Sequence, residues 1–184
     1  SAPAFTQEFG GNPPSVKWQQ GNTPEARVIF PRGLDTAAQH IAGIVQYLNR
    51  HTGATAGTAQ RKINIVLQNQ TTLANGYVGL APWRSEFFLT PQFNSFQLGS
   101  LPWVDNLAIH EYRHVQQYMN YRKGLSKLAY IILGEEGQAI ANSAAIPNWF
   151  FEGDAVFQET AVSGQGRGRI PYFFNGYRSL WQAD

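Results

Sequence analysis

The chain has 184 residues, of which 43% are hydrophobic and 14% aromatic, enough for one folded domain with its own core. A formal net charge of +2, without any block of basic residues, argues against a nucleic-acid-binding protein. The longest apolar run is much shorter than the roughly 18 residues of a membrane-spanning helix, and the absence of cysteine excludes disulfides and cysteine-containing zinc sites.

The two ends of the chain suggest a processed and shortened protein. The chain opens on Ser-Ala-Pro-Ala without a charged segment and apolar run, so we expect no signal peptide within these residues. A mature secreted protein would begin this way, and so would a trimmed one; we expect a secreted or periplasmic location. Residues 178–184 read as an element that is interrupted, so we expect the natural protein to continue.

Strands and one helix are expected in the first part of the chain. Residues 1–26 are rich in Gly, Pro, Asn and Gln and predict an irregular lead-in with at most short strands. The further elements, predicted from periodicity and turn residues, are a strand at 27–30, a helix at 34–49, a flexible connector at 51–58, a strand at 63–67, and strands near 76–80 and 86–90.

Helical patterns dominate from Trp103 onward. The predicted segments are a helix at 104–121, helical stretches at 125–133 and 138–144 interrupted by glycines, a helix at 148–161 opened by Pro147, and an irregular glycine-rich stretch with an aromatic tail. The fold class predicted is α+β, with a small N-terminal mixed sheet and helix followed by a mainly helical lobe. As a single domain it divides into the lead-in 1–26, a strand-rich lobe 27–102, site-bearing helices 103–162 and a tail 163–184.

His110-Glu111-Tyr112-Arg113-His114 is an HExxH motif within a predicted helix. Residues four apart share a helix face, so His110 and His114 can both reach one Zn²⁺ ion. Glu111 is rotated by about 100° and can approach a metal-activated water as general base. It shares its helix face with apolar residues, where a buried carboxylate without a partner or a function would destabilise the fold.

A catalytic zinc site needs a third protein ligand and an open fourth position. The extended motif HExxHxxGxxH fails because Gln117 and Asn120 stand at its Gly and His positions, and no histidine follows His114. The third ligand is therefore a carboxylate, or else the earlier His40 or His51.

Glu152 is the strongest candidate for this ligand. On the predicted helix it shares an otherwise apolar face with Glu159, two turns away. We assign Glu152 to the metal and Glu159 to the orientation of a liganding imidazole, with an ordinary salt bridge as the alternative for Glu159. Asp154 points off this face, toward solvent or a cap.

The HExxH motif followed by Trp149-Phe150-Phe151-Glu152-Gly153-Asp154-Ala155 resembles the gluzincin metallopeptidases. This resemblance implies a thermolysin-like layout with the zinc site in the cleft between two lobes. It also implies an edge strand that holds extended substrate, which would fall at Arg84, Ser85, Glu86 and Phe87. The wider sequence resembles bacterial peptidase-like domains that precede a TolB-like β-propeller, so a C-terminal propeller is an expected partner.

The chain departs from the gluzincin pattern in one respect that concerns catalysis. Gluzincins add a Tyr or His that stabilises the oxyanion, and no downstream histidine exists here. Tyr172 and Tyr177 are the candidates, against a role as core aromatics. Arg167 and Arg169 could act electrostatically, but a solvated loop is the simpler interpretation.

The sequence therefore predicts a zinc-dependent metallopeptidase whose partner is a peptide or protein substrate. One alternative is a catalytically inactive, zinc-stabilised binding or scaffold module. Another is zinc-dependent hydrolysis of a non-peptide bond.

Overall fold

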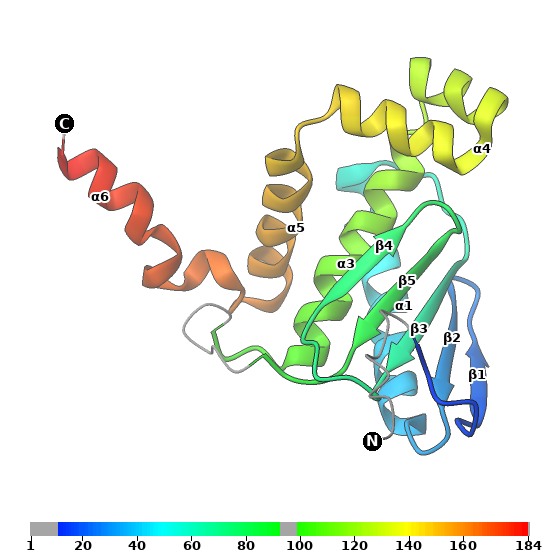
Figure 1. Ribbon diagram of the computed structural model, residues 1–184. Coiled ribbons are helices and arrows are strands. Elements are labelled where there is room, and N and C mark those ends of the chain that lie inside the picture. The colour runs from blue at the N-terminus through cyan, green and yellow to red at the C-terminus, as the bar shows by residue number, and fades with distance from the viewer. Residues whose placement is uncertain (1–10, 93–98, 184) are drawn as a thin grey trace, which may run out of the picture.

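The computed structural model describes residues 11–92 and 99–183 (Figure 1). Residues 1–10 of the expected lead-in, 93–98 of the expected strand-rich lobe, and Asp184 lie outside the described residues. Within the described ranges the chain is a mixed α+β fold, which confirms the predicted class.

One mixed sheet runs in the order β1-β2-β3-β5-β4. Its strands are β1 (Trp18–Asn22), β2 (Ala26–Pro31), β3 (Ile63–Gln68), β4 (Gly76–Gly79) and β5 (Arg84–Phe88). The inner pairs β2–β3 and β3–β5 are parallel, and the outer pairs β1–β2 and β4–β5 are antiparallel. Alternate residues of β2 and β3 are buried, as expected for strands with one face on a core.

Two helices, α1 (Asp35–Ala56) and α3 (Trp103–Asn120), pack against each other and against one face of the sheet. The core between them is aliphatic with a few aromatics, and its fully buried side chains include Val28, Ile41, Val45, Ile65, Leu67 and Phe87. The apolar stripe of each helix faces this core, as is usual for surface helices. Because α3 lies between the core and α5, the side of α3 that faces α5 lies outside the apolar core and can bear polar side chains.

The remaining helices follow α3 along the chain. They are α4 (Gly124–Ala145), α5 (Asn148–Ser163), the short 3-10 helices η1 (Arg167–Arg169) and η2 (Pro171–Phe174), and α6 (Asn175–Ala183). The backbone of α4 is non-helical at Gly134, which divides it into two halves. Helix α5 packs along α3, and Figure 1 shows α6 extending away from the sheet.

The predicted connector at 51–58 is wrong, because α1 continues to Ala56. Tertiary contacts extend the helix past Asn49: the Thr52 hydroxyl is buried and bonded to Gln116, and Arg113 donates to the Thr55 hydroxyl. The glycine-rich stretch that was expected to be irregular includes the short helix η1, and the aromatic tail after it forms η2 and α6. Within the described residues, no helix combines the length and apolar character needed to cross a bilayer.

The expected substrate edge strand is corrected by the sheet topology. Arg84, Ser85, Glu86 and Phe87 belong to β5, which is paired on both sides, with β3 and with β4. Both its backbone edges are used within the sheet, so β5 cannot accept another strand. The strand at this end of the sheet is β4.

Candidate metal centre

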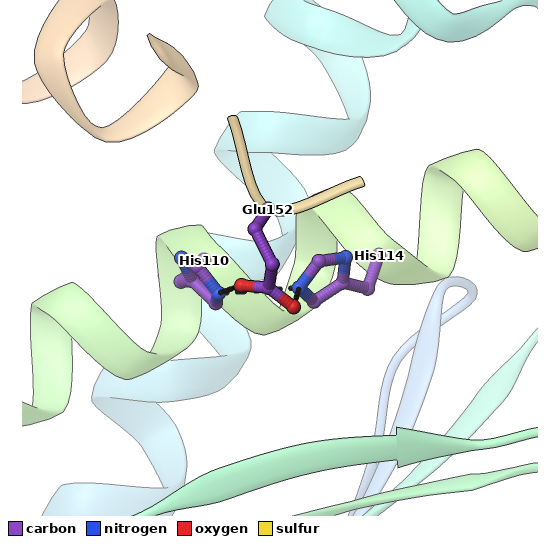
Figure 2. Close-up of side chains that lie close together, drawn as sticks. All are labelled: His110, His114 and Glu152. Carbon is purple, nitrogen blue, oxygen red and sulfur yellow. Dashed lines mark hydrogen bonds and ion pairs between the residues drawn. The ribbon is translucent and has the colours of Figure 1, made fainter. Parts of the chain in front are cut away.

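His110 and His114 project from one side of α3, next to Glu152 of α5 (Figure 2). Their Nε2 atoms are 3.1 Å apart, and the two rings meet edge-on at 84°. Both residues are only 8% exposed, because α5 covers them. The four-residue spacing therefore places two imidazole nitrogens at one point, as the helix period requires.

Glu152 reaches the same point from α5. Its Oε2 lies 3.2 Å from Nε2 of His110, and its Oε1 lies 3.6 Å from Nε2 of His114 (Figure 2). Its side chain is 50% exposed, so the carboxylate forms the outer rim of a site whose inner wall is the two buried imidazoles.

The separations between these donor atoms fit a zinc ion. Zn–N bonds of about 2.0–2.1 Å at tetrahedral angles place neighbouring ligand atoms about 3.3 Å apart. The 3.1 Å between the two Nε2 atoms is close to this value, and Glu152 brings one oxygen to 3.2 Å from His110 Nε2 and the other to 3.6 Å from His114 Nε2. Two imidazoles and one carboxylate are a donor set that zinc accepts, and three ligands leave a fourth position free. In the part of the chain that the structure describes, this is the group of His and acidic side chains close enough to hold a metal.

The two other histidines lie elsewhere. His40 is bonded to Asp105 at 2.6 Å, and His51 stacks on Tyr47. Neither joins His110 and His114, so the carboxylate alternative for the third ligand is the one that the geometry favours.

The two histidines differ in their affinity for protons when no metal is present. Burial lowers the pKa of His110, but hydrogen bonds with Glu152 and Glu159 outweigh it and raise this pKa to about 9. Burial and the neighbouring His110 lower the pKa of His114. A proton on His110 Nε2 then points at the lone pair of His114 Nε2, and a metal ion would replace that proton.

Glu159 lies behind His110 and is fully buried. Its Oε1 accepts a hydrogen bond from Nδ1 of His110 at 2.6 Å, which turns Nε2 of the ring toward Glu152 and the candidate metal point. Asn106 and the guanidinium of Arg167 also donate to the Glu159 carboxylate. Although burial opposes ionisation, the hydrogen bonds from Arg167 and His110 hold the pKa of Glu159 below its usual value.

The position of Arg167 corrects the expectation of a solvated loop. Its Nε donates to Oε2 of Glu159 at 3.0 Å, and its Nη2 contacts both Glu159 and His110. The preceding Gly166 lies directly on α5, where a Cβ would be 2.6 Å from the backbone of Glu159 and Thr160. A side chain at 166 would push the loop away, so the glycine keeps Arg167 in the site. Glycine at alternate positions around Arg167 was a sequence signal of close backbone approach.

Glu111 is 5% exposed and lies between α3 and the edge strand β4. A Cβ on Gly76 would be 2.9 Å from Oε1 of Glu111 and 2.8 Å from Cδ2 of Leu107. A side chain at position 76 would displace the side chains of Leu107 and Glu111 from their present places. Burial is the largest influence on the Glu111 pKa and, against the opposing effect of His110, raises it to about 7.

A cleft of about 430 Å³ contains these groups. It lies between β4 on one side and α3 and α5 on the other, with the Arg167 loop at its margin. Besides the candidate ligands and Glu111, its walls include Asn75, Tyr77, Trp103, Tyr118, Phe151 and Arg167. The cleft therefore joins the candidate metal point to β4, the last strand in the sheet order.

Tyr172 and Tyr177, the expected oxyanion stabilisers, do not line this cleft. They lie on η2 and α6 and are 53% and 67% exposed. Tyr77 and Tyr118 line it instead. Within β5, Ser85 and Phe87 are buried, whereas Glu86 accepts hydrogen bonds from Tyr77 and Arg84.

The expected orientation of Asp154, toward solvent or a cap, is wrong. Its carboxylate accepts two hydrogen bonds from Arg113, a residue inside the HExxH motif that is 3% exposed. Burial raises the pKa of Asp154, but bonds from Arg113 and Gln117 outweigh this effect and lower it. Gln117 also contacts His114, so the two histidines each have a buried partner behind them.

Comparisons with protein-family models, with curated proteins and with solved structures found no match to this chain.

Replacing Glu159 by Gln should weaken zinc binding about 10–100-fold, the usual cost of losing the partner of a liganding imidazole. The amide keeps the size of the carboxylate but removes the charge that holds His110 and Arg167. Competition with a chromogenic chelator would measure the affinity, with Glu136→Gln on exposed α4 as control. Equal affinities in parent and Glu159→Gln protein would leave Glu159 with a purely structural ion pair.

Proposed function

We propose that this chain is a zinc-dependent metallopeptidase domain of the gluzincin type. The observation that carries the proposal is the convergence of His110, His114 and Glu152 on one point, with the buried carboxylate of Glu111 in the same cleft. The HExxH motif and the Trp-x-x-Glu-Gly-x-Ala segment that supply these residues are the ones that resemble the gluzincins.

In this proposal His110, His114 and Glu152 hold the metal. When bound, zinc supplies a Lewis acid that polarises a carbonyl group and lowers the pKa of a water molecule. Glu159 keeps the His110 imidazole turned toward the site. The half-exposed Glu152 lies on the solvent side, so a substrate reaches the site through the cleft.

Glu111 acts as the general base. It takes a proton from the attacking water as the new C–O bond forms at the peptide carbonyl carbon. It then delivers that proton to the amide nitrogen as the C–N bond breaks, so the products are a carboxylic acid and an amine. Burial gives Glu111 a pKa of about 7 in the metal-free site, and a bound cation would lower it, so the carboxylate would be ionised and able to accept the proton at neutral pH.

In this proposal Arg167 stabilises the oxyanion, the role for which Tyr172 and Tyr177 were the candidates from sequence. Its guanidinium lines the cleft, and the bonds to Glu159 use Nε and Nη2. Among the described residues no hydrogen bond engages Nη1. A cation fixed beside the reacting centre stabilises the negative charge that develops on the carbonyl oxygen.

The substrate strand is proposed to be β4 rather than β5. Strand β4 ends the sheet, lines the cleft through Gly76, Tyr77 and Val78, and lies against Glu111. An extended peptide that pairs with its outer edge would pass directly over the candidate metal point. Backbone pairing of this kind favours peptides over other hydrolysable substrates.

Cleavage of a diverse peptide library, followed by mass spectrometry, tests the proposal. Zinc-loaded protein should cut the library, chelator-stripped protein should not, and added zinc should restore the cleavage. Stoichiometric zinc binding without cleavage would instead support an inactive zinc-stabilised module or hydrolysis of a non-peptide bond. If the protein bound no zinc, the proposal that His110, His114 and Glu152 form a zinc site would be wrong.

A further inference from the structure

The buried amide of Gln117 lies behind His114, on the side opposite the candidate metal point. Its Oε1 is 2.8 Å from Nδ1 of His114. Its Nε2 donates to the carbonyl oxygen of Phe151 at 3.0 Å and to Oδ2 of Asp154 at 2.7 Å. Gln117 is 0% exposed, so solvent does not compete for these groups.

These partners determine which way the amide faces. A carbonyl oxygen and a carboxylate paired with an arginine can only accept hydrogen bonds, so both require the NH₂ group of Gln117. The amide oxygen must then face His114. Because that oxygen can only accept, Nδ1 of His114 must carry the proton, and the lone pair lies on Nε2, toward His110 and Glu152.

Asp154 is held in its accepting role by Arg113. Nε and Nη2 of Arg113 donate to the two carboxylate oxygens at 2.7 and 2.9 Å, the two-pronged geometry typical of strong Arg–carboxylate pairs. The remaining nitrogen, Nη1, donates to the Thr55 hydroxyl of α1 at 2.9 Å. The ion pair thus joins α1, α3 and α5 immediately behind the site.

The same contacts hold Glu152 in place. Gln117 bonds to the residue just before Glu152, through the Phe151 carbonyl, and to Asp154, two residues after it. The side chain of Glu152 is half exposed and bonded to the two imidazoles, so the position of its backbone decides where the carboxylate lies. Helix α5 is pinned to α3 on both sides of this one residue.

We propose that Gln117 is a positioning residue which, through Phe151 and the Arg113–Asp154 pair, fixes the Nδ1-protonated form of His114 and the place of Glu152. The site is thereby arranged before a metal binds. The inference rests on the proposed function, because it takes His114 and Glu152 as metal ligands. The tautomer of His114, however, can be observed without any metal.

The first test is the tautomer itself, read from long-range ¹H–¹⁵N correlations of the histidine side chains in the metal-free chain. The proton of neutral His114 should be on Nδ1 in the parent. In Gln117→Met no hydrogen-bond acceptor faces Nδ1 of His114, which should raise the Nε2-protonated fraction. An Nε2-protonated His114 in the parent would overturn the inference.

The second test compares zinc affinities of Gln117→Met and Gln138→Met. Gln138 is a matched control, because it is also 0% exposed and its amide is hydrogen-bonded at both ends, to the Tyr118 carbonyl and to Arg122, but it bonds to none of the proposed metal ligands. We expect about 10–100-fold weaker binding for Gln117→Met and an unchanged affinity for Gln138→Met. Equal affinities of Gln117→Met and the parent would refute the positioning role.

The two proposals can fail separately. If the parent bound no zinc, the proposed function would fail, while the tautomer measurement would still decide the role of Gln117. If Gln117→Met did not fold, Asp154→Asn would serve in the affinity comparison, since it disturbs the same amide without leaving a cavity.

Discussion

Replacing Glu111 by Gln should abolish peptide cleavage and leave zinc binding nearly unchanged. The amide has the size of the carboxylate and fits the space beside Gly76, but it cannot take a proton from water. Loss of a general base costs about 10²–10⁴-fold in rate. The rate of a single peptide from the library, measured at saturating substrate, would report this loss, and zinc content would be measured on the same sample.

The matched control for this change is Glu135→Gln. Glu135 lies on α4 and pairs with Arg61. It does not line the cleft. Its replacement should leave the rate of cleavage unaltered. A Glu111→Gln protein that retained most of the parent rate would show that another group accepts the proton.

Replacing Glu152 by Ala should cost more zinc affinity than any other single carboxylate in the cleft. It would leave His110 and His114 as the only protein ligands of those proposed. Loss of a residue that only hydrogen-bonds to a metal ligand lowers metal affinity about 10–100-fold. We therefore expect loss of the ligand Glu152 itself to lower zinc affinity by more than about 100-fold. Isothermal titration with zinc, with a competing chelator for the parent, would measure the difference.

The folded state should survive this replacement, since the Glu152 side chain is half exposed and supports no core packing. Circular dichroism of the zinc-free protein would check that. The same substitution at exposed Glu136 should leave the affinity at the parent value. Unchanged zinc affinity in the Glu152→Ala protein would assign the third ligand to some other residue.

Much of the candidate site could be predicted because it depends on the helix period. His110 and His114, four residues apart, must share a face of one helix, and Glu152 and Glu159, seven apart, must share a face of another. The apolar neighbours indicated correctly that Glu111 and Glu159 are buried, whereas Glu152 is half exposed and Trp149 on its face is 73% exposed. Local spacing was sufficient to bring each pair together.

The remaining features depend on contacts between distant segments. Nothing local to β5 distinguishes an edge strand from an interior one; its place follows from parallel pairing with β3 across a separation of about 20 residues, which periodicity does not report. Asp154 and Arg113 meet only because α5 packs along α3. Arg167 enters the site because a glycine lets its loop lie directly on α5, a consequence of packing that a solvated-loop interpretation overlooks.

The shortness of β4 has a consequence for turnover. With four residues, Gly76–Gly79, this strand offers an incoming chain only a few backbone donors and acceptors. Each such bond adds only about 0.5–1.5 kcal/mol in net terms, so a cleaved peptide that loses half of its paired length would dissociate readily. Because β4 is so short, it is also a poor template for the edge-to-edge pairing by which longer edge strands cause aggregation.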